Sequence, residues 1–331
     1  MARTRYASDP GLIARMGATM FLLGLVFVGF GVGLAFVIVY LPHYLHHGAA
    51  ANTGSTVGGT GIIAIAAIIG IGSAVASYYW SDKIALRTSG ARLVSPNDGP
   101  QAERLHGIVD RLCALADMPK PRVAIAPTQM PNAFATGRSS KVAVVCATEG
   151  ILQRLDNNEL EGVLAHEMSH VAHKDVAVMT IASFLGIVAA LMVRFAFYSE
   201  LFGGGGRGRG GSNNSQSALL IIPVMLLSIV VYSVSFLLIR LLSRYRELSA
   251  DRSGALLTGQ PSALASALVK VTGDMARIPM KDLRAAEPLN TFYFAPALRP
   301  GQNNMATIFS THPSLERRLA ELDKISKQLS R

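Results

Sequence analysis

Four long apolar runs dominate the pattern of hydrophobic and polar residues along this chain. They cover residues 16–41, 58–79, 176–197 and 218–239, and Arg194 is the one charged residue within them. A helix of about 20 residues crosses the hydrocarbon core of a bilayer, so each run predicts a transmembrane helix. For 176–197, a buried or interfacial helix is the alternative.

Shorter patterns lie between the second and third apolar runs. Residues 101–116 repeat apolar positions three and four apart, which predicts an amphipathic helix. Residues 122–126 and 141–146 are short β-rich runs and predict neighbouring strands. Asn157 and then Glu159 supply a cap and a first-turn acid for the next helix. This order predicts a small sheet followed by a helix.

These elements divide the chain into two transmembrane hairpins and one soluble domain in two parts. Residues 1–80 are the first hairpin, and residues 176–239 are the second, with a Gly-rich, flexible loop at 203–217. Residues 81–175 and 240–331 are the two parts of the soluble domain. The expected fold class is α+β, mainly helical, with a small β-sheet and four transmembrane helices.

Composition and charge agree with a membrane protein. Charged residues make up 16% of the 331 residues, below the ~25% of soluble domains. Basic residues precede the first run and follow the second and fourth, whereas residues 42–57 contain no Lys or Arg. Cytoplasmic loops are rich in Lys and Arg, so both termini and 81–175 are expected in the cytoplasm, with Arg207 and Arg209 as exceptions. The net charge of +10 indicates topology and attraction to anionic lipid rather than nucleic-acid binding.

A candidate metal centre lies in the sequence His166-Glu167-Met168-Ser169-His170. Residues four apart share one helix face, so His166 and His170 can bind the same zinc ion. Glu167 points elsewhere and can act as general base on the metal's water. The alternative is a chance pattern on an amphipathic helix.

A catalytic zinc site needs a third protein ligand, and the chain offers two candidates. His173 lies seven residues from His166, about 10.5 Å along a helix, which is awkward for one tetrahedral ion. Glu247 is the better candidate, because Asp251 four residues later shares its helix face and can orient a ligand histidine. The alternative is that Glu247 balances neighbouring arginines. A hairpin of the third and fourth apolar runs would bring Glu247 to the histidines.

These motifs together resemble the HtpX-like membrane zinc metalloproteases, relatives of the CaaX prenyl proteases. The resemblance covers nearly the whole chain, including the four-span layout. Its motifs are His166-Glu167-x-x-His170 with Asp175, Glu247-x-x-x-Asp251, Asn132-Ala133-Phe134-Ala135-Thr136-Gly137, and His312-Pro313-Ser314 with Arg318. The resemblance implies a gluzincin-type peptidase domain that holds one Zn²⁺ per chain. It implies His166, His170 and Glu247 as ligands, Glu167 as base, and Asp175 and Asp251 as supporting carboxylates.

The resemblance also implies roles for residues outside the ligand helices. Asn132 and Ala133 match a segment that contacts the substrate backbone; the alternative is that Asn132 is a turn residue. His312 and Arg318 match positions that stabilise an anionic tetrahedral intermediate. For these two, the alternative is that Pro313 starts the last helix and Arg318 makes a structural pair.

The resemblance implies peptide-bond hydrolysis in a prokaryotic inner membrane, in quality control of misfolded or damaged membrane proteins, and the basic residues predict that this occurs at the cytoplasmic face. Expected partners are those substrates, membrane lipid and other membrane quality-control proteases, but no nucleic acid. The alternative is a proteolytically inactive, zinc-stabilised scaffold or chaperone-like protein. Structural zinc sites usually have four protein ligands, so three ligands and a base favour catalysis.

Overall fold

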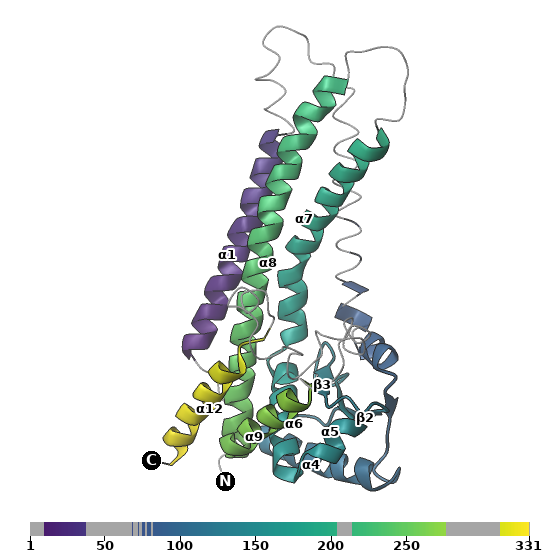
Figure 1. Ribbon diagram of the computed structural model, residues 1–331, viewed down its shortest axis with the longest axis vertical. Coiled ribbons are helices and arrows are strands. Elements are labelled where there is room, and N and C mark those ends of the chain that lie inside the picture. Colours follow the sequence, from purple (N-terminus) through teal and green to yellow (C-terminus); the bar gives the residue numbers. More distant parts are fainter. Residues whose placement is uncertain are drawn as a thin grey trace. The chain divides into compact units, whose positions relative to one another are not determined.

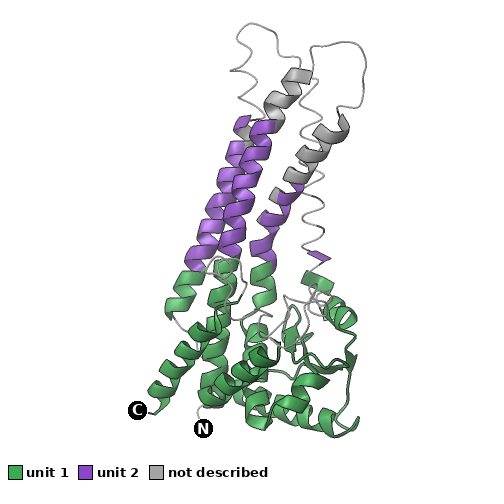
Figure 2. Cartoon of the chain, in the orientation of Figure 1, with its two compact units in different colours: residues 1–16, 77–179, 240–331 green, residues 17–76, 180–239 purple. Residues whose placement is uncertain are grey.

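The computed structural model describes residues 10–37, 82–203, 214–275 and 312–330, with single positions between 68 and 80 (Figure 1). Most of the predicted second span lies outside the described residues, as do the connection at 42–57 and the centre of the loop at 203–217. The chain divides into two compact units (Figure 2). Unit 1 comprises residues 1–16, 77–179 and 240–331, and unit 2 comprises residues 17–76 and 180–239.

Three long helices overlap the other three predicted spans. They are α1 (Pro10–Ala35), α7 (Asp175–Gly203) and α8 (Asn214–Thr258). Within unit 2, Phe30 of α1 and Val231 of α8 form a buried apolar cluster, and Val188 of α7 packs against it. A Cβ at Gly33 would lie 3.0 Å from Leu227, so this glycine lets α1 and α8 approach closely.

Two of the described helices are long and apolar enough to cross a membrane, Pro10–Gly33 and Ile222–Thr258. Helix α7 joins them if it is counted together with the preceding helix, from which it is bent by 59°. The 37 residues of Ile222–Thr258 extend for about 55 Å, more than a ~30 Å hydrocarbon core requires. The apolar stretch of α8 ends at Ile239 and Arg240 follows, so the last part of α8 lies beyond the membrane-spanning segment.

A four-stranded sheet forms one part of unit 1. Its strands are β1 (Arg92–Leu93), β2 (Arg122–Ala126), β3 (Ala133–Thr136) and β4 (Val144–Thr148), in the order β1-β2-β4-β3. Strands β2 and β4 are parallel neighbours, which confirms the predicted pairing, although β4 begins at Val144 because residues 140–142 form a turn. Strand β3 was not predicted as a separate strand, because it contains two alanines, which have weak β-propensity.

Helices pack on this sheet and on one another around the main core. They are α4 (Pro100–Ala116), α5 (Glu149–Arg154), α6 (Asn157–Ala172), α9 (Pro261–Met275) and α12 (Leu315–Leu329). Leu105 and Leu112 of α4 share this core with Leu160 and Leu164 of α6. The amphipathic helix predicted over 101–116 is therefore confirmed, and α6 is buried along most of its length.

The start of α6 differs from the predicted one by a single residue. Asp156, not Asn157, is the N-cap: its Oδ1 accepts the Glu159 N–H at 2.9 Å, and Glu159 Oε2 accepts the Asp156 N–H at 3.1 Å. This reciprocal pair is a capping box. Asn157 is already helical, and its Oδ1 accepts a hydrogen bond from Arg104 Nε at 2.6 Å.

Candidate metal centre

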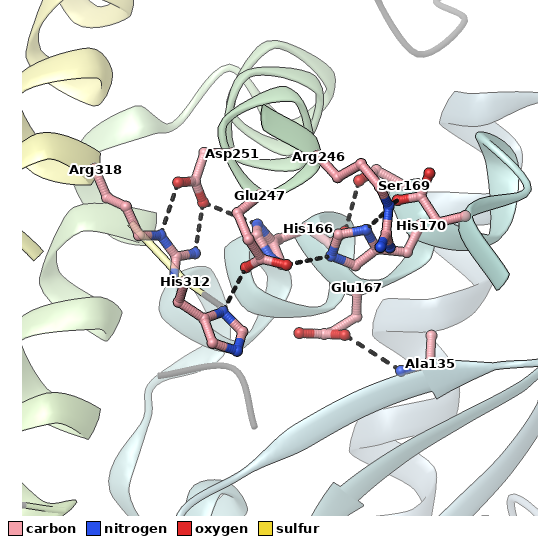
Figure 3. Close-up of polar contacts among 11 residues, drawn as sticks. Ala135, His166, Glu167, Ser169, His170, Arg246, Glu247, Asp251, His312 and Arg318 are labelled. Atoms are coloured by element: carbon pink, nitrogen blue, oxygen red, sulfur yellow. Dashed lines mark hydrogen bonds and ion pairs between the residues drawn. The ribbon is translucent and has the colours of Figure 1, made fainter. Parts of the chain in front are cut away.

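Two helices of unit 1 bring three potential metal ligands together. His166 and His170 lie one turn apart on α6, and Glu247 faces them from α8 (Figure 3). One ligand atom from each lies within 4.8 Å of the others. Glu247 Oε2 is 3.6 Å from His166 Nε2, and Glu247 Oε1 is 3.5 Å from His170 Nε2. The third ligand favoured by the sequence therefore lies beside the two histidines.

The spacing of these donor atoms fits a shared cation. Zinc bonds of 2.0–2.2 Å at tetrahedral angles separate ligand atoms by about 3.3–3.6 Å. The observed 3.5 and 3.6 Å lie in that range, and they are long for hydrogen bonds between nitrogen and oxygen. Two imidazoles and one carboxylate also form a donor set that catalytic zinc accepts while one position stays open. The residues present therefore fit zinc.

Two further carboxylates hold the histidine rings from behind. His166 Nδ1 lies 2.8 Å from Asp251 Oδ1, and His170 Nδ1 lies 2.5 Å from Asp175 Oδ2. Each imidazole thus donates its Nδ1–H away from the centre, which leaves Nε2 to face Glu247. Carboxylates in this position fix the tautomer and the orientation of a ligand histidine.

The local field favours positive charge at this centre. Burial opposes ionisation of Asp175, but Arg246 and His170 lower its pKa to about 2. Burial likewise disfavours a charged imidazole at His166, yet Asp251 and Glu247 raise the pKa of this histidine to about 9. The same cluster of carboxylates attracts a divalent cation, which needs the imidazole nitrogens deprotonated.

Glu167 lies between the ligand helix and the sheet. Its side chain is buried, with 6% exposed, and its Oε2 accepts a hydrogen bond from the backbone N–H of Ala135 on β3 at 3.3 Å (Figure 3). Burial raises the pKa of the Glu167 carboxyl, although His166 and His170 oppose this effect. The carboxylate is thus held beside the ligands but outside the ligand cluster, as a general base requires.

Comparison with known proteins identifies the family. Residues 100–326 match Peptidase family M48. The chain belongs to this family. It is 52% identical over 329 residues to Protease HtpX homolog 1 of Streptomyces coelicolor, covering 99% of this chain and 97% of that protein. It is 48% identical to Protease HtpX homolog 2 of Methanosarcina mazei, covering 99% of this chain and all of the relative. These findings confirm the predicted membrane metalloprotease and its resemblance to the HtpX-like proteins.

A solved structure shares the fold of this M48 peptidase. The crystal structure of S. mikatae Ste24p superposes with a TM-score of 0.52 at 18% sequence identity. The match covers 92% of this chain and 67% of the Ste24p chain. The fold is therefore Ste24p-like and mainly helical, with a small mixed sheet.

The structure places His312 and Arg318 behind the ligands. His312 Nδ1 donates to Glu247 Oε2 at 3.0 Å. Arg318 on α12 is 1% exposed, and its Nε and Nη2 donate to Asp251 at 2.8 and 2.7 Å. These contacts are with the carboxylates of the centre, and the predicted roles at the tetrahedral intermediate remain predictions. Ser314 caps α12, which begins at Leu315.

Asn132 and Ala133 lie at the start of the edge strand β3. The Asn132 N–H donates to Thr148 Oγ1 at 3.0 Å, and its carbonyl accepts the Thr148 N–H at 2.9 Å. The Asn132 backbone therefore bonds to β4. The N–H and C=O groups of successive residues point to opposite sides of a strand. The backbone groups of Ala133 and Ala135 therefore point away from β4, and the Ala135 N–H bonds to Glu167 on α6. Substrate contact by Asn132 and Ala133 remains a prediction.

Some residues of the centre were missed in the sequence. Arg246 Nε lies 2.9 Å from Asp175 Oδ2. The sequence indicates Arg246 only as one of the arginines whose charge Glu247 can balance. Gly254 packs against His166 at the crossing of α6 and α8. A glycine inside a helix is a signal of close packing. His173, the weaker candidate for a third ligand, ends α6 as its C-cap and is not part of the ligand cluster found among the described residues.

Proposed function

We propose that this M48 peptidase is a zinc metalloendopeptidase with one Zn²⁺ per chain, acting on unfolded or damaged membrane proteins at the cytoplasmic surface of a prokaryotic inner membrane. The observation that carries the proposal is the buried carboxylate of Glu167 beside a cluster of His166, His170 and Glu247. A closed structural site would usually have a fourth protein ligand.

Each residue of the centre has a distinct role in this mechanism. His166, His170 and Glu247 would hold the metal, and Asp251 and Asp175 keep both imidazoles oriented. When bound, zinc supplies Lewis acidity, which lowers the pKa of water and polarises the scissile carbonyl. Glu167 takes a proton from the attacking water and passes it to the leaving amine.

The edge strand β3 supports an extended substrate. It is the last strand in the order β1-β2-β4-β3, and its Ala135 bonds to Glu167. A peptide added beside such an edge forms backbone hydrogen bonds whatever its sequence. Unfolded segments offer extended backbone, whereas folded domains do not, and this difference favours a role in quality control.

The distribution of basic residues supports the cytoplasmic orientation. Lys83 and Arg87 follow the second apolar run, Arg240 and Arg244 follow the fourth, and the connection at 42–57 has no Lys or Arg. Positive residues collect on the cytoplasmic side. The same reasoning makes membrane lipid a partner, and other membrane quality-control proteases are the expected functional partners.

The proposal is tested by hydrolysis of an unfolded protein with detergent-purified, zinc-loaded enzyme and its Glu167→Gln variant. We expect cleavage by the wild type and its loss in the variant, with zinc still bound at one per chain. Glu316→Gln, on the exposed start of α12, is the matched control and should cleave normally. Equal cleavage by wild type and Glu167→Gln would point to a contaminant, and no cleavage by either would favour the scaffold alternative.

A further inference from the structure

A basic pocket lies in unit 1 on residues that the proposed mechanism does not use. Its volume is about 360 Å³, and its basic lining residues are Lys83, Arg122, Arg138 and Lys141. Asp82 is the one acidic side chain among the lining residues. None of these residues belongs to the metal-ligand cluster of His166, His170 and Glu247, so the pocket is a second candidate site.

The pocket lies where the second apolar run ends. Tyr79 is the last residue of that run and Trp80 follows it; both line the pocket, with 52% and 55% of their surface exposed. Tyr and Trp are enriched where a membrane helix reaches the headgroup level. Other lining residues come from the sheet region of the unit, with Arg122 at the start of β2 and Arg138 in the β3–β4 loop.

The positive charges in the pocket are only partly compensated. Arg122 pairs with Asp82 at 2.6 Å. The Arg138 guanidinium lies 5.0 Å from the centre of the Tyr79 ring, and its Nη1 donates to the Tyr79 carbonyl at 3.4 Å. Within the described part of the chain, no carboxylate forms an ion pair with Lys83, Arg138 or Lys141. Three cations around one hollow would bind an anion there.

We propose that Lys83, Arg138 and Lys141 bind the phosphate of an anionic phospholipid headgroup, while Tyr79 and Trp80 contact the start of the acyl chains. Basic pockets beside membrane helices recognise such headgroups, and interfacial aromatic residues suit the boundary between headgroup and hydrocarbon. The site rests on the membrane location included in the proposed function but not on proteolysis. A failure to bind lipid would therefore say nothing about peptidase activity. A failure of peptidase activity would likewise say nothing about the lipid site.

The test measures lipid binding by the full chain in detergent. The delipidated protein is titrated with phosphatidylglycerol or phosphatidylcholine, and bound lipid is counted by native mass spectrometry. We expect tighter binding of phosphatidylglycerol that weakens with added salt. Each basic residue near an anionic headgroup is worth about a fivefold change in affinity, so Lys83→Gln/Lys141→Gln should lower phosphatidylglycerol affinity by about 25-fold.

Two controls separate this site from general surface charge. Lys324→Gln/Lys327→Gln removes two exposed lysines of α12 and should leave binding unchanged. Lys141→Glu, a charge reversal at an exposed side chain, should abolish the preference for phosphatidylglycerol while the protein keeps its helical content. Equal affinity for the two lipids, or equal loss in the α12 variant, would overturn the proposal. Competition by inorganic phosphate at lipid-like concentration would overturn the lipid assignment in favour of a free-phosphate site.

Discussion

Gly254 of α8 lies against the backbone of His166 on α6. A Cβ on Gly254 would be only 2.8 Å from the backbone nitrogen of His166. The contact explains how Asp251 and Glu247, about one and two turns before Gly254 on α8, reach the candidate ligand histidines. Two helices can bring short side chains such as these to one ion only if their backbones approach closely at the crossing. A glycine permits that approach because it has no side chain.

We predict that Gly254→Ala weakens both folding and metal binding. The added methyl group meets backbone rather than a flexible side chain, so α6 and α8 must separate, and overpacking of this kind costs about 1–3 kcal/mol. Chemical denaturation and competition with a zinc chelator would measure the two effects. Gly273→Ala on α9 is the matched control: nothing lies within 4 Å of a Cβ there, so its stability should be unchanged or slightly higher. Equal behaviour of the two variants would contradict the proposed role of the crossing.

We predict that Asp251→Asn and Asp175→Asn each lower zinc affinity by about 10–100-fold. Each carboxylate holds the Nδ1–H of a ligand histidine, at His166 and His170 respectively, and an amide holds it less strongly. Chelator competition gives the affinities. Asp274→Asn, whose carboxylate pairs with Arg154 on the surface of unit 1, should bind zinc like the wild type. Unchanged affinity in both site variants would show that the histidines are oriented by other contacts.

We predict that Arg318→Met destabilises the protein by about 3–5 kcal/mol. Arg318 donates two hydrogen bonds to Asp251 in a fully buried setting, so its removal leaves a buried carboxylate without its main counter-charge. Urea denaturation measures the loss. Arg317→Met, one residue earlier on the exposed face of α12, should change stability by about 0.5 kcal/mol or less. A similar small change for Arg318→Met would mean that the buried pair contributes little.

We predict a pH-dependent contribution from Glu159, far from the metal centre. Its carboxylate accepts from Ser266 Oγ at 2.6 Å and pairs with Lys270 at 2.6 Å, and it also closes the capping box of α6. Burial opposes ionisation, but these partners lower the pKa of Glu159 below its ordinary value. A carboxyl with a lowered pKa stabilises the fold above its unfolded pKa and loses this contribution as pH falls through the folded value.

Comparison of wild type with Glu159→Gln measures this contribution. We expect the variant to be less stable at pH 7 by about 1–3 kcal/mol, with the difference shrinking as pH falls below about 4. The free energy of unfolding of both proteins is measured by denaturation at several pH values. The difference between the two proteins at each pH removes the effects of other titratable groups. Glu321→Gln, in an exposed pair with Lys324, should show little difference at any pH. A difference for Glu159→Gln that does not vary with pH would contradict a role for its charge.

Local patterns in the sequence predicted the long apolar helices, the helices α4 and α6, the strands β2 and β4, and the candidate ligands of the metal centre. Helical periodicity places His166 above His170 and Glu247 near Asp251, because side chains four apart always share a face. Hydropathy indicated the long helices α1, α7 and α8, although the second predicted span lies outside the described residues. These inferences succeed because they depend on spacing along one helix or on the thickness of a bilayer, which are the same in any fold.

Only the tertiary structure decided which distant residues meet. Arg318 bonds to Asp251, 67 positions away, and His312 bonds to Glu247, 65 positions away. Glu167 bonds to the backbone of β3, a strand that was not predicted because it contains two alanines. The crossing at Gly254 likewise depends on how α8 packs against α6. No repeat or spacing along the chain records such pairs, because they arise from the shapes of packed helices rather than from local periodicity. The sequence alone indicated the candidate ligands and the apolar helices, because both depend on local spacing and hydropathy. Packing decided which groups lie against those candidate ligands.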